Sequence, residues 1–236
     1  MIEIEGLVKH FGLTSVLRGL NLRVAPGELL ALLGPNGTGK TTLLRILASL
    51  THPSAGLVRV GGWPLPKAAA RVRPHLGFAS HQPLLYGKLT AEENLRFYGR
   101  MYGLDRPESR IDEVLTDVGL SRRRSERVDQ YSRGMQQRLA IARAILHRPD
   151  VLLLDEPYSG LDQDGTARLD QILRGLVTDG RTVVMTTHDV TRGLATAHRA
   201  AVLSRGQVIC DVQCAQVDPD AFAQEYRQAT SRGASQ

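Results

Sequence analysis

The sequence predicts an α/β fold in which a mainly parallel sheet carries a helical insertion. Three observations lead to this fold class. Short apolar runs alternate with helix-like segments after Pro149, a glycine-rich loop joins an apolar run to a helix at residues 34–41, and residues 90–147 show helical periodicity. A chain of 236 residues, of which 42% are hydrophobic and 23% charged, is long enough to bury a core and is neither disordered nor fibrous.

The N-terminal half is predicted to begin with strands and to continue through one helix. The first two strands alternate apolar and polar residues, and the third is a short apolar run that ends at Gly34. The predicted elements are strands over Ile2–Val8, Val16–Val24, Glu28–Leu33, Leu57–Gly62 and Leu76–Ala79, and a helix over about Lys40–Leu50. Trp63 lies in a glycine and proline turn, where we expect a packing residue.

The helical insertion opens with Thr90-Ala91-Glu92-Glu93, a capping-box pattern, and has breaks at Gly103, Pro107 and Gly119. Beyond it, we expect strands over Val151–Leu154, Thr182–Thr186 and Ala200–Leu203 and helices over Gly165–Val177 and Val190–Ala197. The boundaries that follow are one domain over residues 1–230, with a core of 1–88 and 149–217, a helical subdomain of about 89–148, and a frayed tail at 231–236.

The glycine-rich loop has the spacing of a phosphate-binding loop. Gly34-Pro35-Asn36-Gly37-Thr38-Gly39-Lys40-Thr41, followed by Thr42, fits G-x-x-x-x-G-K-[ST] between an apolar strand and a helix. Glycines let backbone N–H groups surround phosphate oxygens, Lys40 reaches the β- and γ-phosphates, and the Thr41 hydroxyl binds Mg²⁺. These residues predict a site for a nucleoside triphosphate with Mg²⁺.

Two acids follow a buried strand, at Asp155 and Glu156. Asp155 is expected to hold the Mg²⁺ ion, whereas Glu156, which points elsewhere because side chains alternate along a strand, is placed to orient and deprotonate a water molecule. Such a pair alone is more often a solvated strand end. Beside a phosphate-binding loop, it favours hydrolysis over mere binding.

Together these motifs resemble the nucleotide-binding subunit of ABC transporters over nearly the whole chain. The resemblance implies an ABC ATPase fold, with a RecA-like P-loop core, an N-terminal antiparallel β region and an inserted helical subdomain. It implies ATP as the nucleotide, Gln82 as a catalytic residue and Mg²⁺ ligand, His188 as the switch histidine, and Phe11 as the aromatic residue that stacks on adenine. The D-loop is implied to be Ser159, Gly160, Leu161 and Asp162. Gln82 and His188 alone could be ordinary polar residues, and Phe11 a core residue.

The segment before Gln136 is similar to the family signature LSGGQ but departs from it. Ser132 and Gly134 stand at matching positions, while Tyr131, Arg133 and Met135 replace Leu, Gly and Gln. The resemblance implies that Ser132, Arg133, Gly134 and Met135 complete the ATP site of a second, head-to-tail subunit. The helix after Ser132 would direct its positive end at the γ-phosphate.

The function implied is an ATPase subunit that drives transport through separate permease subunits, as a homodimer on the inner face of the cell membrane. Gln82, Leu84, Leu85 and Tyr86 would help to form the groove for a permease helix. Residues 93–99 and 155–162 look similar to the ATPase of the haem exporter of cytochrome c maturation, and multidrug or other small-solute export is the alternative. The segment after Gln216 is too short for a substrate-binding regulatory domain, which favours an exporter.

Two other classes stay open: an ABC-type ATPase that acts on ribosomes or DNA, and a regulatory ATP-binding module with little turnover. The net charge of +6 permits an anionic partner. However, the basic run Ser121–Arg127 is most simply a solvated face, and we expect no specific nucleic-acid partner. Cys210 and Cys214 are too few for a disulfide framework or a structural zinc, and no segment has the pattern of a signal peptide or membrane span.

Overall fold

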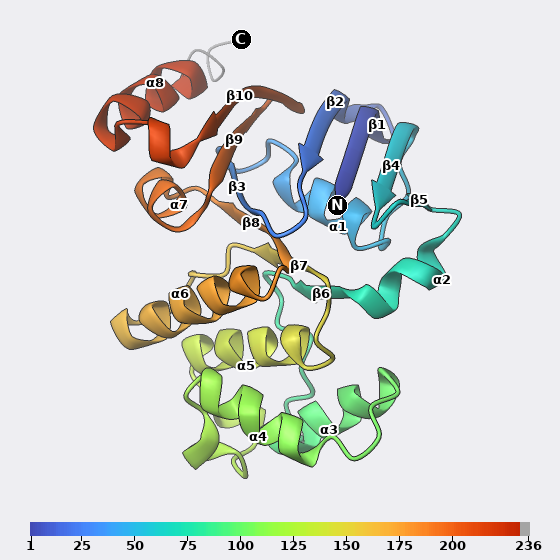
Figure 1. The fold of residues 1–236 in the computed structure, drawn as a ribbon, viewed down its shortest axis with the longest axis vertical. Coiled ribbons are helices and arrows are strands. Elements are labelled where there is room, and N and C mark those ends of the chain that lie inside the picture. Colours follow the sequence, from blue (N-terminus) through green and yellow to red (C-terminus); the bar gives the residue numbers. More distant parts are fainter. Residues whose placement is uncertain (232–236) are drawn as a thin grey trace.

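The computed structural model describes residues 1–231, which form two sheets with helices between and around them (Figure 1). A four-stranded antiparallel sheet has the order β2-β1-β4-β5, and a six-stranded sheet has the order β10-β9-β3-β8-β7-β6. The strands are β1 Ile2–Phe11, β2 Thr14–Val24, β3 Leu29–Leu33, β4 Ala55–Val60, β5 Trp63–Leu65, β6 Leu76–Ala79, β7 Val151–Asp155, β8 Thr182–Thr187, β9 Arg199–Ser204 and β10 Gln207–Gln213.

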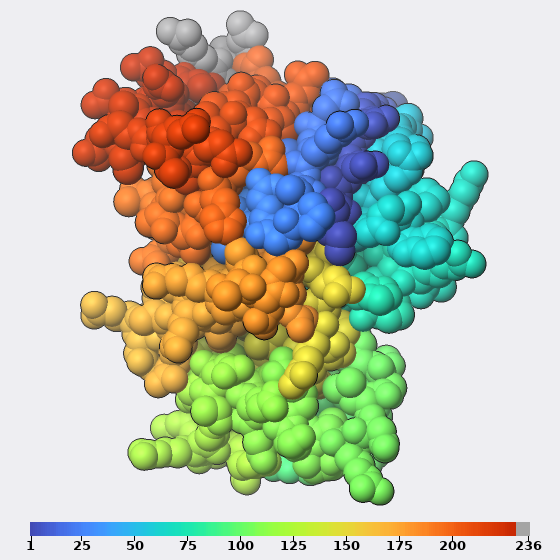
Figure 2. Space-filling view, viewed as in Figure 1, coloured from blue at the N-terminus to red at the C-terminus, as the bar shows by residue number. Residues whose placement is uncertain are grey.

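The helices follow the predicted alternation with the strands. They are α1 Lys40–Leu47, α2 Ala69–Val72, α3 Ala91–Met101, α4 Glu108–Asp117, α5 Arg133–Ile145, α6 Gln163–Thr178, α7 Val190–Thr196 and α8 Pro219–Ser231. Figure 2 shows the helical insertion, in green, at the end of the molecule opposite the C-terminal helix, in red. Of the tail predicted at residues 231–236, Ser231 is instead the last residue of α8, and residues 232–236 lie outside the described residues.

The large sheet is parallel except at one edge, which confirms the predicted fold class. Strand β3 pairs in parallel with β8 and β9, β8 with β7, and β7 with β6, whereas β10 pairs antiparallel with β9. The carboxyl ends of parallel strands lie at one edge of a sheet, where α/β proteins bind ligands. This topology therefore brings the segments after β3, β6, β7 and β8 to a common edge.

Strand β3 divides its side chains between two hydrophobic cores. Leu30 and Leu32 pack with α1 and the antiparallel sheet, whereas Leu29, Ala31 and Leu33 pack on the side of the helices α5 to α7. All five are buried, so the strand reads in the sequence as a continuous apolar run rather than an alternating one. Helix α1 lies between the two sheets (Figure 1).

Several predicted elements need correction. Trp63 lies in strand β5 instead of a turn. It is 41% exposed, and the Arg71 guanidinium packs on its ring 4.7 Å from the ring centre. Helix α1 ends at Leu47, because the chain turns through a left-handed residue at Ser49. Helix α8 was not predicted. Strand β10 was also not predicted, because it is an edge strand with no fully buried residue.

Both cysteines are partly buried and free, and burial raises the pKa of each thiol. A raised pKa keeps a thiol protonated and weakly nucleophilic at neutral pH. Within residues 1–231, no helix combines the length and the apolar character that a membrane span requires.

His147, just after α5, makes the stability of the fold depend on pH. Its ring stacks on Tyr102 at 3.8 Å between centroids, its Nε2 donates to the carbonyl oxygen of Leu76, and burial lowers its pKa to about 4. The folded chain therefore disfavours the protonated ring. This contribution to stability is complete above pH 6.5, the ordinary histidine pKa, and is lost as the pH falls toward 4.

We expect His147→Gln to remove this dependence. Between pH 7 and pH 4, the wild-type chain should lose at most about 3 kcal/mol more unfolding free energy than the variant. Urea unfolding at several pH values measures the difference, and the exposed His52→Gln variant should follow the wild-type curve. Parallel curves for wild type and His147→Gln would contradict the assignment.

Candidate functional site

The predicted phosphate-binding loop leaves β3 and enters α1 without a side-chain cap. Gly39, the N-cap residue of α1, has a φ of 106°, a backbone conformation that favours glycine, and a Cβ there would also lie 2.8 Å from Leu17 Cδ2. Because no side chain caps the helix, the N–H groups of its first turn stay available for an anion.

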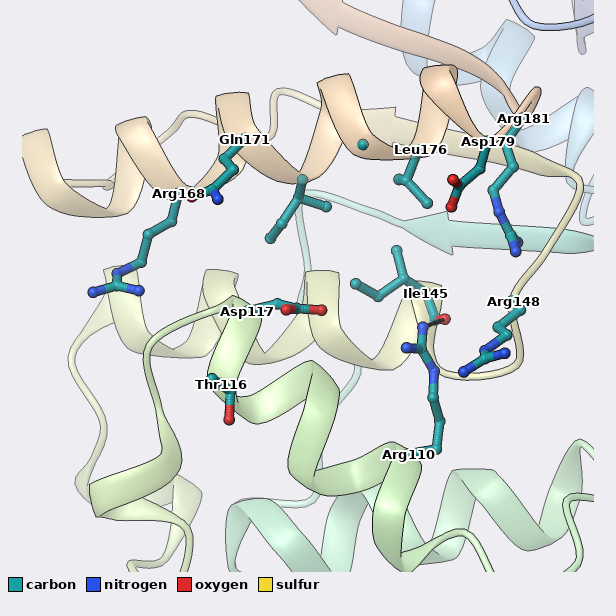
Figure 3. Close-up of a pocket in the computed structure, with 12 residues that line it drawn as sticks. Arg110, Thr116, Asp117, Ile145, Arg148, Arg168, Gln171, Leu176, Asp179 and Arg181 are labelled. Atoms are coloured by element: carbon teal, nitrogen blue, oxygen red, sulfur yellow. Dashed lines mark hydrogen bonds between the residues drawn. The ribbon is translucent and has the colours of Figure 1, made fainter.

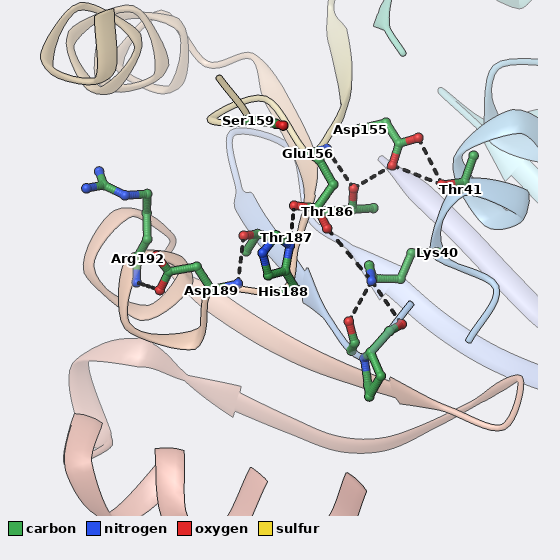
Figure 4. A network of polar contacts seen from close by, with 12 residues as sticks. Lys40, Thr41, Asp155, Glu156, Ser159, Thr186, Thr187, His188, Asp189 and Arg192 are labelled. Carbon is green, nitrogen blue, oxygen red and sulfur yellow. Dashed lines mark hydrogen bonds and ion pairs between the residues drawn. The ribbon is translucent and has the colours of Figure 1, made fainter. Parts of the chain in front are cut away.

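Lys40 is buried at the start of α1 and points toward the predicted catalytic acids (Figure 4). Its Nζ donates to the carbonyl oxygens of Gly34 (2.5 Å) and Pro35 (3.1 Å) and lies 3.8 Å from Glu156 Oε1. Burial lowers the pKa of Lys40, while Glu156 and Asp155 raise it. A partly desolvated ammonium is a strong partner for phosphate oxygens.

Asp155 ends β7 and is held by two hydroxyl groups. Thr41 Oγ1 donates to Asp155 Oδ2 at 2.9 Å, and Thr186 Oγ1, from the neighbouring strand β8, donates to Oδ1 at 2.7 Å. A hydroxyl and a carboxylate oxygen are the ligand types that Mg²⁺ prefers, and the phosphates of a nucleotide commonly supply others. The donor set around Thr41 and Asp155 therefore fits the predicted ion, although the described residues hold no cluster of three His, Cys, Asp or Glu side chains suited to a metal.

Glu156 follows Asp155 in a left-handed conformation, with a φ of 51°. A non-glycine residue pays about 1–2 kcal/mol for this conformation, and such strain is common at functional sites. Its backbone N–H donates to Thr186 Oγ1, and its Oε2 lies 3.0 Å from His188 Nδ1. Within the described chain, Oε1 is buried and makes no hydrogen bond. Glu156 Oε1 therefore lies near the Lys40 ammonium but accepts no hydrogen bond from a described residue.

These residues surround an open cleft of about 580 Å³. Of the predicted site residues, the cleft is lined by Phe11, Asn36, Gly37, Gly39, Lys40, Thr41, Thr42, Asp155, Glu156, Ser159 and His188. Phe11 is half exposed at the rim, with Lys9 Nζ 4.7 Å from the centre of its ring. Gln82 is exposed and does not line the cleft, whereas its neighbour His81 does.

The remaining predicted residues of the loop support its shape. Thr38 Oγ1 donates to the carbonyl oxygen of Pro35, and a Cβ on Gly34 would lie 2.4 Å from the Leu203 carbonyl oxygen. The Thr186 hydroxyl joins Asp155 to Glu156, a role that the sequence patterns do not predict. The one sequence signal for it is its position in Thr186-Thr187-His188, at the end of an apolar strand.

The signature-like segment lies at the start of α5, and none of its residues lines the cleft. Ser132 caps the helix by accepting a hydrogen bond from Met135 N–H at 3.2 Å. Tyr131 is buried where the family pattern has leucine; its hydroxyl donates to the Arg123 carbonyl oxygen, and burial raises its pKa to about 12. Tyr131 and Arg133, which differ from the family signature, therefore do not disrupt the N-terminal end of α5.

The predicted D-loop packs against this helix start within the same chain. A Cβ on Gly134 would lie 2.6 Å from the Gly160 carbonyl oxygen, so glycine is required there. Arg133 Nη2 reaches Ser159 Oγ at 3.5 Å. Asp162 caps α6 by accepting from Gly165 N–H, while Leu161 packs on the core.

A second cleft, of about 670 Å³, lies between α6 and the helices α4 and α5 (Figure 3). Four arginines line it, but each already has a partner. Arg110 and Arg148 contact Glu113, Arg168 contacts Asp164, and Arg181 donates to the Pro149 carbonyl oxygen. The cleft contains none of the sequence-predicted site residues.

Comparison with known proteins decides the family. Residues 17–159, more than half of the sequence, match the family described as ABC transporter. The chain belongs to the ABC transporter family. It is an ATP-binding subunit with ATPase activity, as the resemblance implied.

Relatives of this ABC transporter ATPase include proteins with export and resistance names. The chain is 37% identical over 212 residues to Nod factor export ATP-binding protein I of Paraburkholderia xenovorans, covering 89% of this chain and 70% of the relative. It is 39% identical over 212 residues to daunorubicin resistance ATP-binding protein DrrA3 of Streptomyces coeruleorubidus, covering 89% and 67%.

Solved structures confirm the ABC ATPase fold. One described as the ATP-binding subunit of an ABC transporter matches with a TM-score of 0.85 and 27% identity over 98% of this chain and 96% of that one. A dimeric ATP-binding cassette in a post-hydrolysis state, bound to ADP and Pi, matches with a TM-score of 0.83 and 30% identity over 91% and 99%.

Proposed function

We propose that this ABC transporter ATPase drives the export of a small solute through separate permease subunits, by hydrolysing ATP in a head-to-tail homodimer. The observation that carries the proposal is the convergence of Lys40, Thr41, Asp155, Glu156 and His188 on one cleft. The export direction is supported by the names of the two relatives described above, which concern Nod factor export and daunorubicin resistance.

In this proposal the triphosphate lies along the loop at the start of α1. Lys40 exchanges its carbonyl partners for the terminal phosphate oxygens, while Phe11 at the rim stacks on adenine. Thr41 and Asp155 would hold Mg²⁺, which neutralises charge that develops on the phosphates, and Gln82 would approach the ion from its loop.

Glu156 acts as the general base for the attacking water. Its free Oε1 accepts the proton, while His188, 3.0 Å from Oε2, orients the carboxylate and contacts the γ-phosphate. Because Lys40 lies 3.8 Å from the same carboxylate, proton transfer to Glu156 and the charge on the phosphate are electrostatically linked.

The signature residues are proposed to serve the partner's nucleotide. Ser132, Arg133, Gly134 and Met135 begin α5 and stay outside their own cleft, so they are available to a second copy. The dimeric state of the cassette in the similar solved structures supports a homodimer. The Ser132 hydroxyl uses a lone pair for Met135 N–H and keeps its proton for a phosphate oxygen.

Permease docking is proposed at an exposed apolar surface beside the loop of Gln82. This surface consists of Leu84, Tyr86, Phe97 and Met101, which are all exposed, and the rings of Tyr86 and Phe97 are in edge contact at 5.0 Å. Exposed aromatic clusters on a protein surface mark sites of association. Binding there would keep the ATPase at the inner face of the membrane.

The test is purification of tagged Glu156→Gln chain with ATP from detergent-solubilised native membranes. A polytopic membrane protein should copurify, and Phe97→Asp in the same background should lower its yield at least about tenfold through the cost of burying a charge. The matched control is Leu13→Asp, because Leu13 is a fully exposed apolar residue on the β1–β2 turn.

Other outcomes separate the alternatives. Ribosomal proteins or nucleic acid in place of a permease would contradict the transporter proposal. A haem absorption band in the purified complex would favour haem as the solute, which no name among the described relatives supports. Its absence, with a permease present, favours multidrug or other small-solute export.

A further inference from the structure

Arg143, in the last turns of α5, is a buried cation that pairs with no acid in the described part of the chain. Its side chain is 5% exposed, and no ion pair among residues 1–231 involves it. Removing a guanidinium from water without a counter-charge is costly unless other groups accept its hydrogen bonds. The groups that accept hydrogen bonds from Arg143 therefore indicate its structural role.

The acceptors are the two ends of the loop that contains Gln82. Arg143 Nη2 donates to the Phe78 carbonyl oxygen at 2.8 Å, in strand β6, and Nη1 donates to the Leu84 carbonyl oxygen at 3.1 Å. Only residues 79–83 lie between them. A planar guanidinium with a fixed fork of donors can hold two such carbonyls at once.

The Leu84 carbonyl receives a second donor from α3. Tyr98 Oη donates to it at 2.6 Å, and the Tyr98 ring lies 5.1 Å from the Arg143 guanidinium. Leu84 itself has a left-handed backbone, with a φ of 51°, which is unfavourable for a branched side chain. Two donors thus fix one strained residue at the end of the loop.

The C-terminal end of α5 and the residues just after it are held tightly against β6. A Cβ on Gly77 would lie 2.2 Å from the Ala144 carbonyl oxygen, and His147 Nε2 contacts the Leu76 carbonyl oxygen at 3.0 Å. At the other end of α5, Ser132 begins the signature helix, roughly 16 Å away at 1.5 Å of rise per residue. The loop of Gln82 and the signature are therefore attached to one rigid helix.

We propose that Arg143 is a positioning residue that clamps both ends of the Gln82 loop to the signature helix. The clamp fixes how far Gln82 reaches toward the Mg²⁺ and γ-phosphate position, and it makes the loop follow any movement of α5. This inference rests on the proposed role of Gln82 in the ATP site. Arg143 touches neither nucleotide nor metal and acts only through the loop.

Arg143→Lys tests the clamp, because lysine keeps the charge but presents a single ammonium that cannot span both carbonyls. Three quantities are measured: the melting temperature, ATP affinity without Mg²⁺, and the Mg²⁺ concentration for half-maximal ATPase activity. We expect this Mg²⁺ concentration to rise about tenfold and kcat to fall about tenfold, with ATP affinity without Mg²⁺ within about twofold of wild type.

The matched control is Arg110→Lys. Arg110 also donates to two carbonyl oxygens, those of Leu146 and Ile145, but it does not contact the Gln82 loop. It should lower the melting temperature without changing the Mg²⁺ dependence. Equal Mg²⁺ effects in both variants, or none in Arg143→Lys, would overturn the proposal.

Two further variants keep the inference separate from the proposed function. If Gln82→Ala has the Mg²⁺ dependence of wild type, the proposed role of Gln82 is wrong. If Gln82→Ala alters the Mg²⁺ dependence while Arg143→Lys behaves as wild type, only the clamp proposal is wrong. In the Gln82→Ala background, Arg143→Lys should add little to the Mg²⁺ effect. Should Arg143→Lys not fold, Tyr98→Phe removes the second donor to Leu84, and its Mg²⁺ requirement should rise about threefold; an unchanged requirement contradicts the clamp.

Discussion

Replacing Glu156 with Gln is expected to lower ATP turnover about 10²- to 10⁴-fold while ATP binding persists. The carboxylate has one oxygen beside His188 and one without a hydrogen bond, and an amide of the same shape cannot accept a proton from water. The substitution also removes a negative charge 3.8 Å from Lys40, so the γ-phosphate loses a competitor for the ammonium. ATP affinity should be equal to or higher than that of wild type.

Steady-state phosphate release and equilibrium binding of a fluorescent ATP analogue measure the two effects. Glu126→Gln is the control, because Glu126 pairs with Arg123 on the surface and lies outside the cleft. Its turnover should match wild type. Wild-type turnover in Glu156→Gln would show that another group takes the proton.

Replacing Lys40 with Met should weaken ATP binding about 100-fold and abolish measurable hydrolysis. The Lys40 side chain is 6% exposed and is the one lysine that lines the cleft in residues 1–231, so its attraction to phosphate is little weakened by water. Methionine preserves the length of the apolar stem. Folding should be little affected, because burial already disfavours the charged form of Lys40.

The measurement is nucleotide titration together with thermal unfolding. Lys67→Met is the control for the loss of one positive charge, since Lys67 is exposed and outside the cleft. A large fall in melting temperature with unchanged nucleotide affinity would make Lys40 a structural residue and reject its phosphate role.

The sequence was sufficient to predict the fold class because the site motifs and the strand pattern agree. The loop at Gly34, the acids after Leu154 and His188 each follow an apolar run, and parallel pairing of β3, β8 and β7 brings those run ends together. The sequence pattern and the strand pairing therefore both predict a site at the carboxyl edge of the parallel sheet. The comparisons confirm the ABC ATPase fold, while the individual roles in the site stay predictions.

What the sequence did not predict depends on contacts between distant residues. Thr186 joins the two acids through its hydroxyl, which a strand pattern cannot distinguish from an ordinary buried threonine. Arg143 resembles any arginine on an amphipathic helix until its two carbonyl partners are known. Strand β10 has alternating, half-exposed residues at a sheet edge, where the hydrophobic signal is weakest.

The two-sided burial of β3 also bears on how the molecule loses its structure. On one face its residues pack in a layer formed by α1 and the antiparallel sheet. On the other face they pack in a layer formed by the helices α5 to α7. Neither layer can separate from this strand without exposing leucines to water, at about 1.5–3 kcal/mol for each. The sheet therefore makes the antiparallel region and the helices around it one cooperative unit, and a cavity made in either core weakens both.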